Sequence, residues 1–297
     1  MMQMANSFDF EGFSTSFCDL AGEGDVRCDV LAHSILGRDV PVLTLGTGQK
    51  AVVYVGGVCG TEWILAKVLL GLVRDFCARS QKGSKAFDVN LSYLAAERRI
   101  IVVPMLNPDG IAYATDGVGE DNPLFERVMK MNGSADFSTW QANARGTDLA
   151  FNFDAGFEAH RARAGLLNGA PVGYGGEHPE SEPESAALGR LLRFLGDELL
   201  GLVEFRLGAG EIRCNCRDKL TAKTMSAGRI LARATGYRLA DLENAVPEGS
   251  VCDWCIEKLS RPAYRVECDA RKFAPERVGA CLTETLARTF YTFPFMV

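Results

Sequence analysis

A continuous apolar strand that runs through a glycine pair into a helix is the feature that most constrains the fold of this chain. Residues 51–55 read AVVYV, Gly56 and Gly57 follow, and an apolar-rich helical pattern covers residues 63–77. A short run without polar alternation is typical of a strand buried on both faces, which needs helices on both sides of its sheet. This segment therefore predicts an α/β protein.

Further buried runs alternate with helical patterns along the 297 residues. The pattern predicts a hairpin at 30–45, strands at 99–105, 199–207 and 263–268, and helices at 181–200 and 225–236; NPDG at 107–110 is a turn signal. This order predicts an α/β/α sandwich around a largely parallel or mixed sheet. Because no repeat or linker interrupts it, we expect one domain over residues 1–297, with residues 1–25 as an N-terminal extension.

Composition excludes several classes of partner. The formal net charge is −6 and no basic run is present, so nucleic acid is not an expected partner. No apolar stretch reaches the roughly 18 residues that a membrane-spanning helix needs. The N-terminal residues lack a basic region followed by an apolar core, so we expect a cytoplasmic protein whose ten cysteines are mostly reduced.

Seven stretches in this order resemble the zinc carboxypeptidase family, the carboxypeptidase A-like metallopeptidases. They are GRDVPVLTLG, GGVCGTEW, VPMLNPDG, NARGTDLAFNF, SEPESAAL, GSVCDW and YRVEC, between about residues 35 and 270. The resemblance implies a mixed sheet of about eight strands between helices. It also implies hydrolysis of a peptide or amide bond near a chain end, with zinc polarising the carbonyl and activating water.

The metal ligands of that family are incompletely matched. Cys59 and Glu62 fall on the first ligand pair, with a thiol where the family has histidine. The third ligand position falls on Leu207, or on Arg206 if the alignment slips by one, and neither side chain can bind zinc. The histidines of the chain fall at none of the family's ligand positions. We therefore expect zinc to be absent or weakly bound.

Other family roles fall on residues that also have ordinary structural interpretations. Glu267 matches the general base but is equally compatible with an ion pair. Arg145 is a candidate catalytic cation, although arginines are commonly surface charges. Asn143 and Cys252 are candidate substrate-binding residues. The family's pair that grips the substrate carboxylate is replaced by apolar side chains, namely Ala150 and Phe151.

Three hypotheses follow. The first is a non-catalytic family member that binds a peptide or a small amino-acid-like ligand. The alternative is an active metallopeptidase, of carboxypeptidase or amidase type, whose zinc site is rebuilt with a thiol from the group Cys214, Cys216, Cys252, Cys255 and Cys268. A third interpretation makes the C-x-x-C of residues 252–255 a redox pair.

Overall fold

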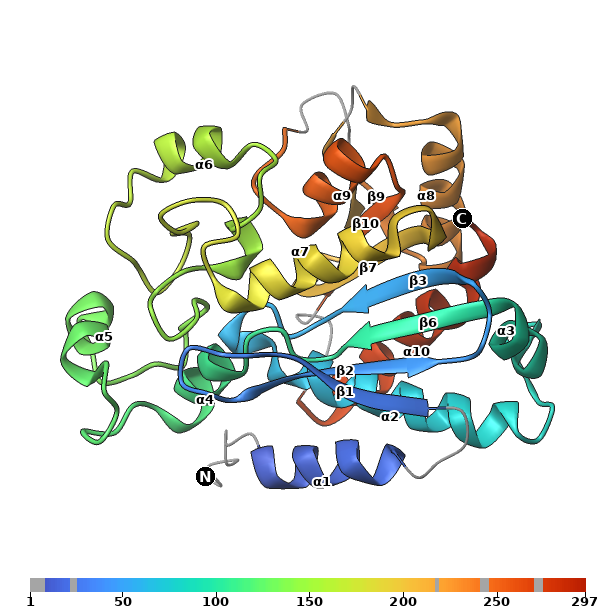
Figure 1. Cartoon of the computed structure of the whole chain (residues 1–297), viewed down its shortest axis with the longest axis horizontal. Coiled ribbons are helices and arrows are strands. Elements are labelled where there is room, and N and C mark those ends of the chain that lie inside the picture. The colour runs from blue at the N-terminus through green and yellow to red at the C-terminus, as the bar shows by residue number, and fades with distance from the viewer. Residues whose placement is uncertain (1–8, 22–25, 217–218, 241–245, 270–274) are drawn as a thin grey trace.

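The core of the protein is an eight-stranded sheet (Figure 1). The computed structural model describes residues 9–21, 26–216, 219–240, 246–269 and 275–297, with side chains of the last segment from residue 283. In spatial order the strands are β1 (Val26–His33), β2 (Asp39–Leu45), β6 (Arg98–Val103), β3 (Lys50–Val55), β7 (Leu199–Gly208), β10 (Ala263–Asp269), β8 (Glu211–Arg213) and β9 (Arg238–Leu239).

The sheet is mixed, as predicted. The four central strands β6, β3, β7 and β10 are parallel to their neighbours within this group. β1 and β2 form the predicted antiparallel hairpin, and β2 joins β6 antiparallel. β8 runs antiparallel to β10. The carboxyl ends of β3, β7 and β10 therefore meet at one edge, which brings Cys59, Arg206 and Glu267 into one region.

Helices cover both faces of the sheet. α2 (Trp63–Ser80) and α8 (Ala222–Thr235) both contact α10 (Pro275–Thr292) on one face. α7 (Pro183–Leu195) and α9 (Val251–Leu259) contact each other on the opposite face. This layering confirms the predicted α/β sandwich with helices on both sides.

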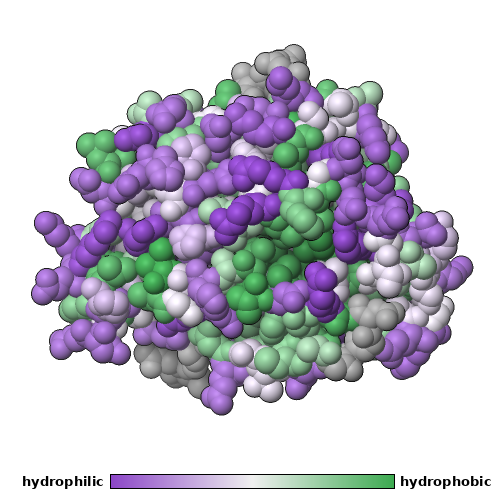
Figure 2. All heavy atoms as spheres, viewed as in Figure 1, coloured by the Kyte–Doolittle hydropathy of each residue, from purple (hydrophilic) through white to green (hydrophobic). Residues whose placement is uncertain are grey.

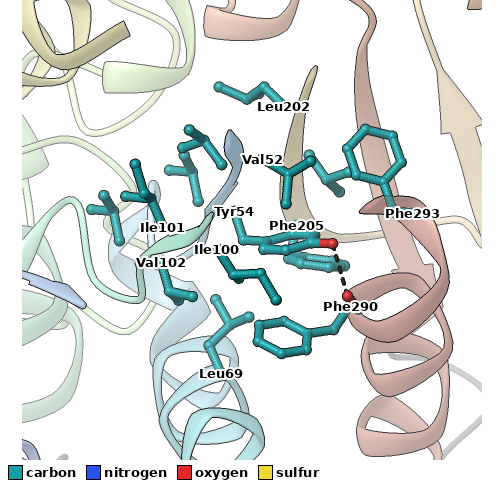
Figure 3. Packing of buried hydrophobic residues seen from close by; sticks show 14 of the residues in the cluster. Val52, Tyr54, Leu69, Ile100, Ile101, Val102, Leu202, Phe205, Phe290 and Phe293 are labelled. Carbon is teal, nitrogen blue, oxygen red and sulfur yellow. Dashed lines mark hydrogen bonds between the residues drawn. The ribbon is translucent and has the colours of Figure 1, made fainter. Parts of the chain in front are cut away.

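Aromatic side chains tie the central strands to α10 (Figure 3). Tyr54 of β3 stacks on Phe205 of β7 and on Phe290 of α10, with ring centroids 5.9 and 4.9 Å apart. The buried Tyr54 hydroxyl donates a 2.9 Å hydrogen bond to the carbonyl of Phe290, so its polar atom is satisfied. Because side chains alternate along a strand, Glu204 and Arg206 must point to the opposite face from Phe205, toward α9.

Two expectations need correction. The NPDG stretch begins a helix, α4 (Pro108–Asp116), because the Asn107 side chain accepts a 2.9 Å hydrogen bond from the amide of Gly110 and proline fits the first helical turn. The helix expected at 181–200 stops at Leu195. Gly196 follows with φ +50°, a positive value that favours glycine, and the helix ends there before β7 begins.

Several shorter elements complete the chain. They are α1 (Phe10–Leu20), β4 (Lys85–Ala86), β5 (Val89–Asn90), α3 (Leu91–Glu97), α5 (Phe125–Asn132) and α6 (Phe157–Ala164). α1 lies within the predicted N-terminal extension, where it contacts α2 and β1. Figure 2 shows apolar residues gathered in the middle of one face, below the hydrophilic band that follows α7. Within the described residues, no helix combines the length and apolar character that crossing a bilayer would require.

Candidate functional site

Cys59 and Glu62 lie together on the turn between β3 and α2. The turn opens with Gly56 and Gly57, and residues 60–62 form a short 3-10 segment. A Cβ atom on Gly60 would lie 2.4 Å from the carbonyl oxygens of Gly110 and Trp140, so only glycine allows this close approach. The Glu62 carboxylate accepts a 3.2 Å hydrogen bond from the Cys59 amide. This contact fixes both side chains at the carboxyl end of β3.

The Arg206 side chain reaches this pair from the adjacent strand. Its Nη2 lies 2.8 Å from the Cys59 sulfur, and its Nε lies 2.8 Å from the Glu62 carboxylate. Leu207, the first candidate for the third ligand position, contributes its backbone amide to Glu62 at 3.0 Å. The sequence left Leu207 and Arg206 as alternatives for the third ligand position. Of these two residues, it is Arg206 whose side chain lies against Cys59 and Glu62.

These residues do not suit a zinc ion. Zinc needs three protein lone-pair donors at a catalytic site. Here the thiol and the carboxylate are joined by a guanidinium, which has only N–H donors and a permanent positive charge. In the described part of the chain, no group of three or more His, Cys, Asp or Glu side chains is placed to hold a metal ion. The guanidinium already lies between the two remaining donor side chains.

Burial and charge set the protonation of this cluster. Burial raises the pKa of the Cys59 thiol well above its ordinary value, and the neighbouring Arg206 only partly opposes this. The thiol is therefore neutral near pH 7. Burial lowers the pKa of Arg206, but the surrounding acidic groups, among them the carboxylates of Glu62, Glu204 and Asp148, outweigh it and raise that pKa well above its ordinary value. The guanidinium is thus a fixed cation in this cluster.

Glu204 connects the cluster to a second arginine. The carboxylate of Glu204 lies 3.2 Å from Arg206 Nη1 and 3.5 Å from Arg265 Nε. Burial alone would raise the pKa of Glu204, but Arg265 and Arg206 outweigh it and lower that pKa. The thiol of Cys252, at the start of α9, lies 3.6 Å from the same carboxylate. Cys252, a candidate substrate-binding residue, therefore contacts the ionic cluster from the helix side.

Asp148 supports the cluster from the segment that reads DLAFNF. Its carboxylate lies 3.7 Å from the Cys59 sulfur and accepts backbone hydrogen bonds from Ala150 and Gly173. Ala150 is buried, and the ring of Phe151 stacks on His160 with centroids 4.0 Å apart. The two positions at which the resemblance implies a carboxylate-binding pair are thus apolar.

Arg145 and Asn143 are held by another carboxylate. Arg145 Nη2 lies 2.9 Å from the buried Glu182 carboxylate, and the Asn143 amide donates to the same oxygen at 2.7 Å. Thr147 and Ser181 donate to the second oxygen of Glu182. The structure therefore places the two candidates together, bound to Glu182.

Glu267 lies one strand beyond Arg206. The two residues are register partners in the parallel pair of β10 and β7, so their side chains point to the same face. The carboxylate of Glu267 forms an ion pair with Arg213 Nε at 2.9 Å. The candidate base is therefore near the cluster and is engaged by a cation of its own.

The five cysteines of the rebuilt-site hypothesis are buried structural thiols. Cys214, Cys216, Cys252, Cys255 and Cys268 are all buried. Cys216 donates to the Asp253 carbonyl at 3.2 Å, and burial raises the pKa of Cys255 to about 12. Reactive redox cysteines need exposure and a lowered pKa, so the environment of the C-x-x-C is the opposite of that for a redox pair.

Sequence reasoning missed Glu204 and Glu182, and it did not predict the contact between Asp148 and Cys59. A usable signal was present in β7, where Glu204 and Arg206 are charged residues two apart in an otherwise apolar strand. A two-residue spacing places both on one face, and buried charges need partners. No comparable local signal marks Glu182, because its partners Asn143 and Arg145 lie almost forty residues earlier.

The mixed sheet and the strand–helix turn define the α/β fold of a metallopeptidase family. The family model described as zinc carboxypeptidase matches residues 22–205, and this chain belongs to that family. The matched region ends one residue before Arg206.

Several known proteins are similar to this chain in sequence or in fold. The chain is 26% identical over 238 residues to gamma-D-glutamyl-L-diamino acid endopeptidase 1 of Lysinibacillus sphaericus, covering 80% of this chain and 59% of that protein. It is 30% identical over 175 residues to the uncharacterized protein YqgT of Bacillus subtilis, covering 56% and 45% respectively. The chain thus spans about half the length of these relatives. Carboxypeptidase A from Helicoverpa armigera shares the fold with a TM-score of 0.72 at 17% identity, over 95% of this chain and 71% of that one.

Proposed function

We propose that this protein is a non-hydrolytic member of the zinc carboxypeptidase family that binds a peptide or a small amino-acid-like ligand. The observation that carries the proposal is the Arg206 guanidinium, which bonds to both Cys59 and Glu62 at 2.8 Å. Family hydrolysis needs an open metal position for water and the substrate carbonyl. A guanidinium cannot lower the pKa of a bound water in that way.

The loss extends to the substrate anchor. Ala150 and Phe151 replace the pair that binds a terminal carboxylate in the family, so the exopeptidase specificity has no charged partner there. Preorganised electrostatic groups are each worth about a hundred- to a thousandfold in rate. With both the metal position and the anchor substituted, we expect no measurable carboxypeptidase turnover.

The ligand class follows from the relatives. The Lysinibacillus relative is named for a bond between γ-D-glutamyl and L-diamino acid residues. We therefore propose short peptides that carry this linkage as the first ligands to test. Glu267 and Arg213 support this ligand class, because they place one carboxylate and one guanidinium beside the cluster and both side chains are partly exposed.

The test is a joint measurement on purified wild-type protein. Metal analysis after dialysis against zinc should give far less than one zinc per chain, and mass spectrometry should detect no cleavage of C-terminal residues or of γ-D-glutamyl-diamino acid peptides. Calorimetric titration with the same peptides should detect binding. Stoichiometric zinc together with peptide cleavage would refute the proposal, and absence of any binding would remove its ligand class.

A further inference from the structure

The Arg206 side chain is held in place by contacts with residues from several elements. Its three guanidinium nitrogens each contact a different acceptor, namely the Glu62 carboxylate, the Glu204 carboxylate and the Cys59 sulfur. Its side chain is only 14% exposed. Fixing a long side chain in one conformation costs conformational entropy. Three charge-assisted or polar contacts offset that cost and hold the guanidinium in one defined position.

The position of the guanidinium is the one a metal would need. A zinc ion bound to Cys59 and Glu62 would accept lone pairs from the sulfur and from a carboxylate oxygen. Arg206 instead donates N–H groups to these same two side chains, from the strand that carries the third ligand in the family. A metal ion would accept lone pairs from Cys59 and Glu62, whereas the guanidinium donates hydrogen bonds to them. Both groups place a positive charge at this position.

Glu204 has the role of an orienting partner. It is fully buried on the same face of β7, two residues before Arg206, and binds Arg206 and Arg265. In metal sites, carboxylates behind the ligands fix the ligand orientation. Here a carboxylate fixes the orientation of the cation itself.

We propose that the Arg206 guanidinium is a built-in cation that replaces the metal ion of this family and excludes divalent ions from the site. The inference deepens the proposed non-hydrolytic function and rests on it. It implies that Cys59 and Glu62 remain a usable ligand pair, which the guanidinium blocks. Replacing the guanidinium by a ligand side chain should therefore open a metal site.

Arg206→His tests this directly. We expect the variant to bind about one Co²⁺ or Zn²⁺ per chain under conditions in which the wild type binds none, because histidine supplies the third ligand. With Co²⁺ it should show a near-ultraviolet thiolate-to-cobalt charge-transfer band, because Cys59 becomes a ligand. Arg206→His/Cys59→Ser should lose that band. Arg265→His is the matched control, since it removes a buried arginine from Glu204 but leaves Arg206 between Cys59 and Glu62, and it should bind no metal.

A folded Arg206→His that takes up no metal would overturn the inference and leave the proposed function intact if the wild type is inactive. If the variant fails to fold, nuclear magnetic resonance of the wild type decides. The Arg206 Nε–H signal should exchange slowly with solvent and remain unmoved in millimolar zinc. A shift of that signal with zinc bound at Cys59 would overturn the inference, whereas peptide cleavage by the wild type would instead refute the proposed function.

Discussion

Replacing Arg206 by methionine should destabilise the protein by about 3 kcal/mol. Methionine keeps an apolar stem but leaves Glu62 buried with only two backbone donors, the amides of Cys59 and Leu207. Glu204 keeps Arg265 at 3.5 Å, so Glu62 dominates the loss. Breaking a buried ion pair costs about 3–5 kcal/mol, and the two remaining backbone bonds favour the lower end. At about 2 °C per kcal/mol for a large domain, Tm should fall by about 6 °C.

Urea unfolding of Arg206→Met at pH 7 and at pH 5 measures this effect. Burial already raises the pKa of Glu62, and the loss of Arg206 must raise it further. A carboxyl group whose pKa is higher in the folded state contributes most below its unfolded pKa and loses that contribution as pH rises. The deficit of Arg206→Met should therefore shrink at pH 5.

A second substitution isolates the cause. In Arg206→Met/Glu62→Gln the buried charge is gone, so most of the lost stability should return and its pH dependence should vanish. Arg163→Met is the control, because it breaks an exposed ion pair with Glu248 that is worth less than about 1 kcal/mol. If Arg206→Met costs no more than Arg163→Met, or the deficit is the same at both pH values, the electrostatic reasoning is wrong.

Two further predictions concern buried titratable groups. Burial raises the pKa of Glu184 to about 8, so the stability that its neutral form contributes should be lost as pH rises from about 4.5 to 8. By pH 7 the stability lost in this way is up to about 3 kcal/mol. In Glu184→Gln the slope of the unfolding free energy against pH should therefore be flatter than in the wild type. An unchanged slope would contradict the assignment. Iodoacetamide at pH 7.5 should modify the exposed Cys18 in native protein and leave the buried Cys252 and Cys255 unmodified, which mass spectrometry can check. Rapid labelling of either buried thiol would restore the redox interpretation.

The sheet was predictable because its strands are local apolar runs. β3, β6, β7 and β10 each lie within a few residues of the predicted ranges. Elements fixed by polar contacts were harder to predict. α4 begins at a sequence that favours a turn and a helix start equally, and its helical continuation depends on packing against the turn at residues 60–62. Pattern alone does not include such contacts.

The site was predictable only in part. Cys59 and Glu62 are close in sequence, so their meeting on one turn follows from the strand–helix pattern. The partner of this pair lies more than 140 residues later, where a shift of one residue decides between an apolar side chain and a cation. Because strand alternation sends neighbouring side chains to opposite faces, that single step changes the chemistry of the site completely.

The substitutions at positions 59 and 206 are physically complementary, which argues against a site that has merely lost its ligands. An imidazole facing a guanidinium would need a neutral ring with its lone pair turned inward, whereas a neutral thiol accepts the N–H at any rotation of its proton. Cys59 is also the smaller side chain, so it leaves room for the planar guanidinium between itself and Glu62. With Glu62 as counter-charge and Glu204 as orienting partner, every described nitrogen of Arg206 has an acceptor. A cluster satisfied in this way stabilises the edge of the sheet without a metal, and it offers the metal no position.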